Sequence, residues 1–146
     1  MIIYPILVPL IFAIITVLFW ENQRVKRALS ILSTGLLMIV NINIFFLVYR
    51  EGIQVVQVGD WPAPFGISLV VDLFSAIMLL TTSIVAFLLA IYSFSGIDLA
   101  RRKYGYFPLF QFLLVGVNGS LCTGDLFNLY VWVEVMIICP YVLIVL

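Results

Sequence analysis

Residues 126–146 read LFNLYVWVEVMIICPYVLIVL and contain one charged residue, Glu134. As a helix with a rise of about 1.5 Å per residue, a stretch of this length spans the roughly 30 Å hydrocarbon layer of a bilayer. Glu134 would then lie about 12 Å along the helix axis from its start. The stretch therefore predicts a transmembrane helix that carries an acid inside the membrane.

The rest of the chain has the same apolar character. Of its 146 residues, 65% are hydrophobic and only 10% are charged, and the mean hydropathy is +1.27. These values lie far from those of soluble globular domains. We expect an all-α membrane protein of about five transmembrane helices in a single membrane domain, residues 1–146, with helices at about 2–20, 28–49, 67–94, 106–122 and 126–146.

The first apolar run also has the length of a cleaved signal peptide. However, no basic segment precedes it and no small-residue cleavage site follows it. We therefore expect residues 2–20 to remain as the first helix.

The charged residues indicate how the helices are oriented. All of the seven basic residues except Arg50 lie in the first and third predicted loops, and both lysines, Lys26 and Lys103, are expected there. The positive-inside rule places these two loops in the cytoplasm and the N-terminus outside. The acidic and basic residues cancel, so no basic field predicts binding to nucleic acid.

Glu134 is the strongest candidate for a functional residue. An ionised carboxylate inside a bilayer costs at least several kcal/mol. It must therefore be protonated part of the time, pair with a base on another helix, or face a water-filled cavity, and proton or cation transfer uses each of these states. The competing interpretation is a neutral glutamate that only hydrogen-bonds to a neighbouring helix.

Three nearby residues could support Glu134. Tyr130 and Tyr141 share roughly its helix face, and Pro140 frees a backbone carbonyl, which favours a kink or a bound water. The two tyrosines are equally typical of packing or of the membrane interface.

Two other acids lie near the predicted ends of helices. Asp72 lies near the outer end of the third helix, where the helix dipole stabilises a carboxylate. Asp125 precedes the fifth helix and is typical of an N-cap. Both patterns favour a structural role, with a role for Asp72 in transport as the alternative.

No cofactor or metal site is expected. The chain has no histidine, and its two cysteines, Cys122 and Cys139, are far apart in apolar segments where they act as small apolar residues. The fourth run contains the small residues Gly116, Asn118, Gly119 and Ser120, which predict close approach of another helix.

Two stretches resemble a known family. The segments GDWPAPFGISLVVDLFSAIM (59–78) and TGDLFNLYVWVEVMIICPYVL (123–143) are similar to the D-type subunit of Mrp-type multisubunit Na⁺/H⁺ antiporters. That subunit is similar to proton-pumping membrane subunits of respiratory complex I and of membrane-bound hydrogenases. The resemblance implies that Glu134 is the family's essential fifth-helix glutamate and that Asp72 matches its third-helix acid.

The resemblance also implies that helices are missing from this chain. Family members continue into further helices that carry ion paths and buried lysines, whereas this sequence stops at the end of its fifth apolar run. We expect a truncated or split form, with another chain supplying the remaining helices, or a specialised short subunit.

The function expected from these features is that of a membrane subunit, or its N-terminal part, in a multisubunit monovalent cation/proton antiporter. We expect no enzyme activity in this chain, a multi-pass location in the cell membrane, and contacts with lipid, monovalent cations, protons and other antiporter subunits. One alternative is a proton-translocating membrane-arm subunit of a hydrogenase or complex I-like oxidoreductase. Another is a structural subunit that transports nothing. The sequence leaves the cation and the direction of transport open.

Overall fold

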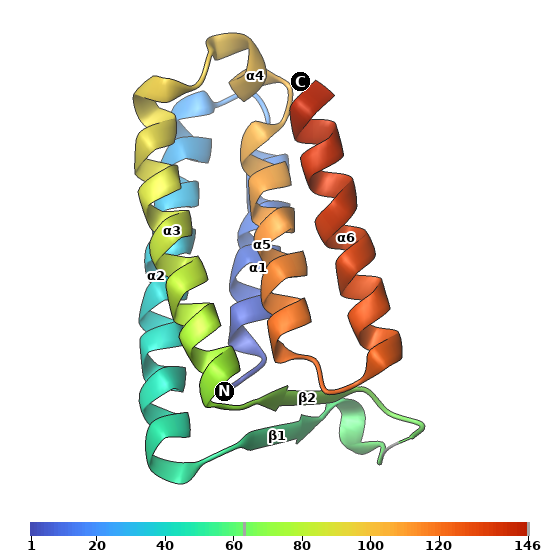
Figure 1. Ribbon diagram of the computed structural model, residues 1–146. Coiled ribbons are helices and arrows are strands. Elements are labelled where there is room, and N and C mark those ends of the chain that lie inside the picture. The colour runs from blue at the N-terminus through green and yellow to red at the C-terminus, as the bar shows by residue number, and fades with distance from the viewer. Residues whose placement is uncertain (63, 146) are drawn as a thin grey trace.

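Five long helices lie side by side, and a short β-hairpin closes one end of the bundle (Figure 1). The computed structural model describes residues 1–62 and 64–145. The long helices are α1 (Tyr4–Leu18), α2 (Gln23–Glu51), α3 (Leu73–Gly96), α5 (Tyr106–Cys122) and α6 (Leu126–Val145). The short elements are β1 (Gln54–Gln57), the 3-10 turn η1 (Val58–Asp60), β2 (Ser68–Val71) and α4 (Leu99–Lys103).

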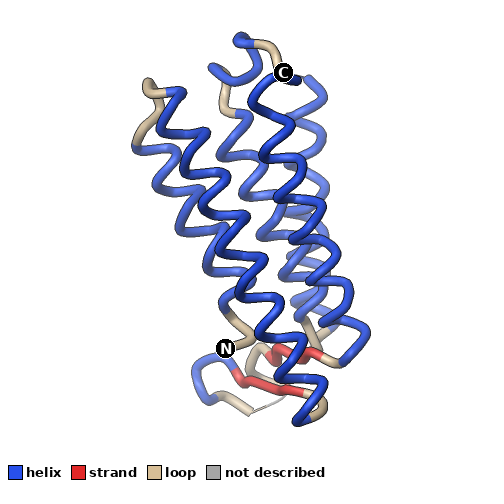
Figure 2. The backbone as a smooth tube through the Cα atoms, turned by 90° about the vertical axis from the view of Figure 1, so that its left-hand side faces the viewer, coloured by secondary structure: helices blue, strands red, loops and turns tan. Residues whose placement is uncertain are grey.

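The helices have the lengths and composition of membrane segments. Within the described residues, α2, α6 and the Leu73–Ser93 part of α3 are long and apolar enough to cross a bilayer, and α1 and α5 are shorter apolar helices. All five long helices run along the length of one bundle (Figure 2). The prediction of an all-α membrane fold with about five helices is therefore confirmed, although α1 is shorter than predicted.

Two apolar clusters hold the helices together. One lies toward the hairpin and joins Ile44, Leu79, Val115 and Cys122 to the hairpin residues Leu69 and Val71. The other includes Leu37, Ala86 and Leu114 of α2, α3 and α5. Helix α6 contributes little to either cluster, because its principal contacts are with α5.

The hairpin corrects the predicted start of the third helix. Residues 67–72 were expected to be helical, but Ser68–Val71 form β2, which pairs antiparallel with β1 from Gln54↔Val71 to Gln57↔Ser68. Leu69 and Val71 are buried whereas Ser68 and Val70 are more accessible, which is the alternation of a strand with one covered face. Helix α3 therefore begins only at Leu73.

The start of α2 also differs from the prediction. Residues 21–27 were expected to form a loop, but α2 begins at Gln23, after Asn22, whose side chain accepts a hydrogen bond from the backbone N–H of Val25 at 3.3 Å. This cap satisfies a free donor of the first turn, so the helix extends through the basic segment. As a result, Lys26 lies within a helix and is 0% exposed, and its prediction as a loop residue is wrong.

The two ends of the bundle differ in charge. The α1–α2 connection, the first turn of α2 and α4 lie at the end opposite the hairpin (Figure 1). All basic residues except Arg50 are in these segments. The cytoplasmic assignment of this end remains a prediction of the positive-inside rule.

Candidate functional site

Helix α6 packs closely on α5 through small residues. A Cβ added to Gly116 would lie 2.8 Å from the backbone nitrogen of Met136, and one added to Gly119 would meet the Trp132 ring. Such distances are shorter than real Cβ contacts allow, so a larger residue at either position would force neighbouring atoms of α6 to shift. The predicted close approach of a helix to this segment is confirmed, and α6 is the helix concerned.

Glu134 lies on the face of α6 that the bundle leaves open. Its side chain is exposed in the isolated chain, as are Tyr130, at 61%, and Tyr141, at 68%. Tyr130 lies one helical turn before Glu134, and its hydroxyl is near enough to interact with the Glu134 carboxylate. Pro140 lies within α6 and is half-buried. Tyr130, Glu134 and Tyr141, which were predicted to share a face, are thus all accessible because no other helix of the described bundle covers them.

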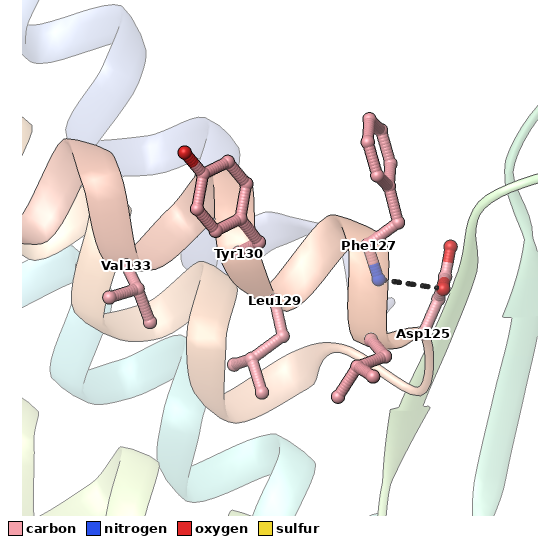
Figure 3. Close-up of a pocket in the computed structure, with 6 residues that line it drawn as sticks. Asp125, Phe127, Leu129, Tyr130 and Val133 are labelled. Carbon is pink, nitrogen blue, oxygen red and sulfur yellow. Dashed lines mark hydrogen bonds between the residues drawn. The ribbon is translucent and has the colours of Figure 1, made fainter.

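A polar turn positions the start of α6. The Asp125 carboxylate accepts a hydrogen bond from the backbone N–H of Phe127 at 3.0 Å, and Asn128 donates to the Thr123 hydroxyl at 2.8 Å. Figure 3 shows this cap and the shallow apolar groove beside it, which Leu129 and Val133 line. The structure therefore supports the predicted capping role of Asp125.

Asp72 also caps a helix. Its carboxylate accepts a hydrogen bond from the backbone N–H of Ser75 at 2.7 Å, and this bond holds the pKa of Asp72 below its usual value. Asp72 lies at the hairpin end of α3, whereas Glu134 lies two turns along α6. The structure gives no contact between these two acids.

Sequence reasoning missed a row of buried polar residues inside the bundle. Lys26, Ser30, Ser33 and Asn41 follow one face of α2, and Gln111 and Asn118 follow one face of α5. Their spacing of three, four, seven or eight residues is the signal that could have revealed this row, because such residues share one helix face. We call these six residues the polar seam.

The part of the chain that the structure describes contains no cluster of three or more histidine, cysteine or acidic residues that could hold a metal ion. Cys122 and Cys139 are both buried with free thiols.

Comparisons with known proteins place the whole chain beside one kind of membrane protein. The D-type subunit of the Na⁺/H⁺ antiporter of Alkalihalophilus pseudofirmus is 43% identical over 146 residues, which is 100% of this chain and 30% of that protein. The chain thus spans less than a third of the length of the curated relatives it matches. No protein-family model matches the chain.

Two solved structures have the same arrangement of helices. The Mrp complex from Dietzia sp. DQ12-45-1b contains a chain that superposes with a TM-score of 0.87 at 31% identity, covering 96% of this chain and 26% of that one. The membrane-bound sulfane sulfur reductase, an archaeal respiratory membrane complex, gives a TM-score of 0.89 at 30% identity, covering 97% of this chain and 29% of that one.

Similarity over the full chain, shared fold and apolar helices agree, and the predicted resemblance is confirmed: this multi-pass membrane chain is homologous to the N-terminal part of the D-type subunits of Na⁺/H⁺ antiporters.

Proposed function

We propose that this chain forms the N-terminal helix bundle of a monovalent cation/proton antiporter subunit, and that Glu134 is the residue through which it takes part in ion translocation. The observation that carries this proposal is the position of Glu134. It is an acid within the apolar length of α6, on a face that no other helix of the bundle covers.

The open face of α6 indicates where the remaining groups would come from. The curated relatives extend far beyond the length of this chain. Helices from the rest of the protein, or from another subunit, would cover the face that carries Tyr130, Glu134 and Tyr141. A base on those helices would complete the environment that a carboxylate needs at this depth.

The chemistry at Glu134 would be a reversible protonation. With a basic partner or water nearby, the carboxylate is the stable form, and when that partner moves away the protonated form is favoured. Tyr130 lies one helical turn before Glu134 and is near enough to interact with its carboxylate. Alternation between the two forms would couple proton release to the movement of a cation.

The test is exchange by the assembled complex in inverted membrane vesicles. We expect Glu134→Gln to abolish sodium- or potassium-dependent proton movement while the complex still assembles, because the amide has nearly the same shape but cannot carry the proton. Glu51→Gln is the matched control, since Glu51 is exposed at the C-terminal end of α2. Unchanged exchange in Glu134→Gln would refute the proposal.

A second function has support from the sulfane sulfur reductase structure, which resembles this chain as closely as the Mrp complex does. In that case the same bundle would form part of the membrane arm of an ion-translocating oxidoreductase. The proteins that co-purify with the chain in mild detergent distinguish the two functions. Iron–sulfur subunits would favour the oxidoreductase, and their absence together with cation-dependent proton exchange would favour the antiporter.

A further inference from the structure

The centre of the polar seam is a cluster of hydrogen bonds between α2 and α5. The Ser33 hydroxyl donates to Gln111 Oε1 at 2.9 Å, and Gln111 Nε2 donates to the Ser30 hydroxyl at 3.4 Å. All three side chains are fully buried, so these bonds lie inside the bundle and away from the lipid-facing surface.

Lys26 lies one turn from this cluster, toward the basic end of the bundle. Its Nζ donates to the backbone carbonyl of Arg102 at 3.5 Å and lies 4.9 Å from the centre of the Trp20 ring. The Gln23 amide, in the orientation that satisfies both its polar atoms, accepts a hydrogen bond from Lys26 Nζ at 3.1 Å. Lys26 thus joins the interior of the bundle to its basic end.

A pocket lies beside Lys26 at the surface. Trp20, Glu21, Gln23 and Lys103 line it. Because Gln23 both lines this pocket and bonds to Lys26, the buried ammonium is one side chain away from the surface at that end.

The other end of the seam lies at the depth of Glu134. Asn41 and Asn118 follow Ser33 and Gln111 by about two helical turns, roughly 11 Å, on helices that run in the same direction. The Gly116 and Gly119 contacts set Asn118 opposite the turn of α6 from Trp132 to Met136, which contains Glu134.

This deep end contains polar atoms that lack a protein partner. Within the described residues, both amide atoms of Asn118, Oδ1 of Asn41 and Nε1 of Trp132 are buried without a hydrogen bond. Asn41 Nδ2, by contrast, donates to the backbone carbonyl of Leu79 at 2.9 Å. Unpaired polar atoms are costly in an apolar interior, and ordered water is their usual partner.

We propose that the polar seam is a water-containing proton path that leads from Lys26 at the basic end to the layer of Asn41 and Asn118 at the depth of Glu134. Buried Leu37 and Leu114 separate the Gln111 cluster from this layer and form the narrow apolar part of the path. The destination of the proton rests on the proposed function of Glu134, whereas the presence of water in the seam does not.

Cysteine reactivity tests the path directly, because a thiol reacts as its thiolate, which forms in water and is suppressed in apolar surroundings. Cys122 and Cys139 are first replaced by alanine in the assembled complex. Ser33→Cys then places a thiol in the seam. Ala86→Cys is the control, because Ala86 is buried in the second apolar cluster. Its depth in the bundle is about that of Ser33. This follows because Leu79 of α3 contacts Asn41 of α2, and Ala86 lies about as far along α3 from Leu79 as Ser33 lies along α2 from Asn41. A small cationic methanethiosulfonate is added from the basic side, and modification is followed by mass spectrometry.

We expect the Ser33→Cys thiol to react about tenfold faster or more than the Ala86→Cys thiol, as a difference of one pKa unit or more requires. Equal and slow reaction at both positions would overturn the path and leave the seam as a dry set of helix-packing hydrogen bonds. Fast reaction at Ser33→Cys together with normal exchange in Glu134→Gln would retain the path and refute the proposed role of Glu134. The two proposals can therefore fail separately.

Discussion

Asp72 caps the start of a helix, although the family resemblance matches it to the third-helix acid of the antiporter subunits. Its carboxylate holds the backbone N–H of Ser75 at 2.7 Å, at the junction where β2 ends and α3 begins. This bond satisfies one of the free donors of the first helical turn, and it lowers the pKa of the carboxyl.

We predict that Asp72→Ala destabilises the protein by about 1 kcal/mol, the typical cost of losing an N-cap. Asp72→Asn should lie close to the wild type, because asparagine caps about as well as aspartate. Thermal unfolding of the purified complex in detergent measures both effects. Loss of proton exchange in Asp72→Asn, with stability intact, would instead assign Asp72 to the transport path.

The same cap has a pH dependence with a definite sign. Because the folded pKa of Asp72 lies below its usual value of 3.8, the cap contributes its full stability above that value. The contribution is lost as the pH falls through the lower, folded pKa, where the carboxylate becomes protonated. The stability difference between wild type and Asp72→Asn should therefore change below about pH 4 and stay constant at neutral pH.

At the scale of elements, the sequence predicts the long helices well and their junctions poorly. The apolar runs are long enough to require helices in a bilayer, and the helices form where they are expected. Residues 67–71 were assigned to a helix because they continue an apolar run. Glycine and proline between two segments rich in β-branched residues, 53–58 and 67–71, are the signal that favours a hairpin.

Lys26 was misplaced for a related reason. A charged residue beside an apolar run is normally assigned to a loop, but a capped helix can continue through a charged turn. The long side chain then reaches the Trp20 ring and the Arg102 carbonyl, which come from other segments. These contacts depend on how distant segments pack, and a hydropathy pattern does not contain that information.

The close contact between α5 and α6 yields a prediction at the same scale. Gly116→Ala would place a methyl group 2.8 Å from the backbone nitrogen of Met136, which cannot rotate away, so the helices must separate. We expect a loss of stability of about 1–3 kcal/mol, as is typical of an overpacked core.

Gly35→Ala is the matched control, because it is also a glycine within a long helix. Its added Cβ would lie 3.6 Å from the Phe87 ring, an ordinary contact, so the change should be neutral or stabilising by up to about 1 kcal/mol. The melting temperatures of the two variants in the same detergent provide the comparison. Equal melting temperatures would contradict the glycine-dependent contact between α5 and α6.

At the scale of the whole molecule, the decisive feature is the open side of α6. Glu134 was identified from the sequence because a charge in an apolar helix needs an explanation. Its partners could not be predicted, because no other helix of the described chain covers the face of α6 that carries Glu134. In the proposed function, the bundle would support Glu134 and other helices would supply the other half of the site.

The most direct test of this account is the protonation of Glu134 in the assembled complex. A hydrophobic carbodiimide modifies carboxyl groups that are protonated in apolar surroundings, and peptide mass spectrometry identifies the modified residue. We predict that Glu134 is modified, that modification falls as the pH rises or as the transported cation is added, and that the helix-capping Asp72 remains unmodified. Modification of Glu134 that is absent, or that is independent of both pH and cation, would contradict the assignment of Glu134 as the proton-exchanging group.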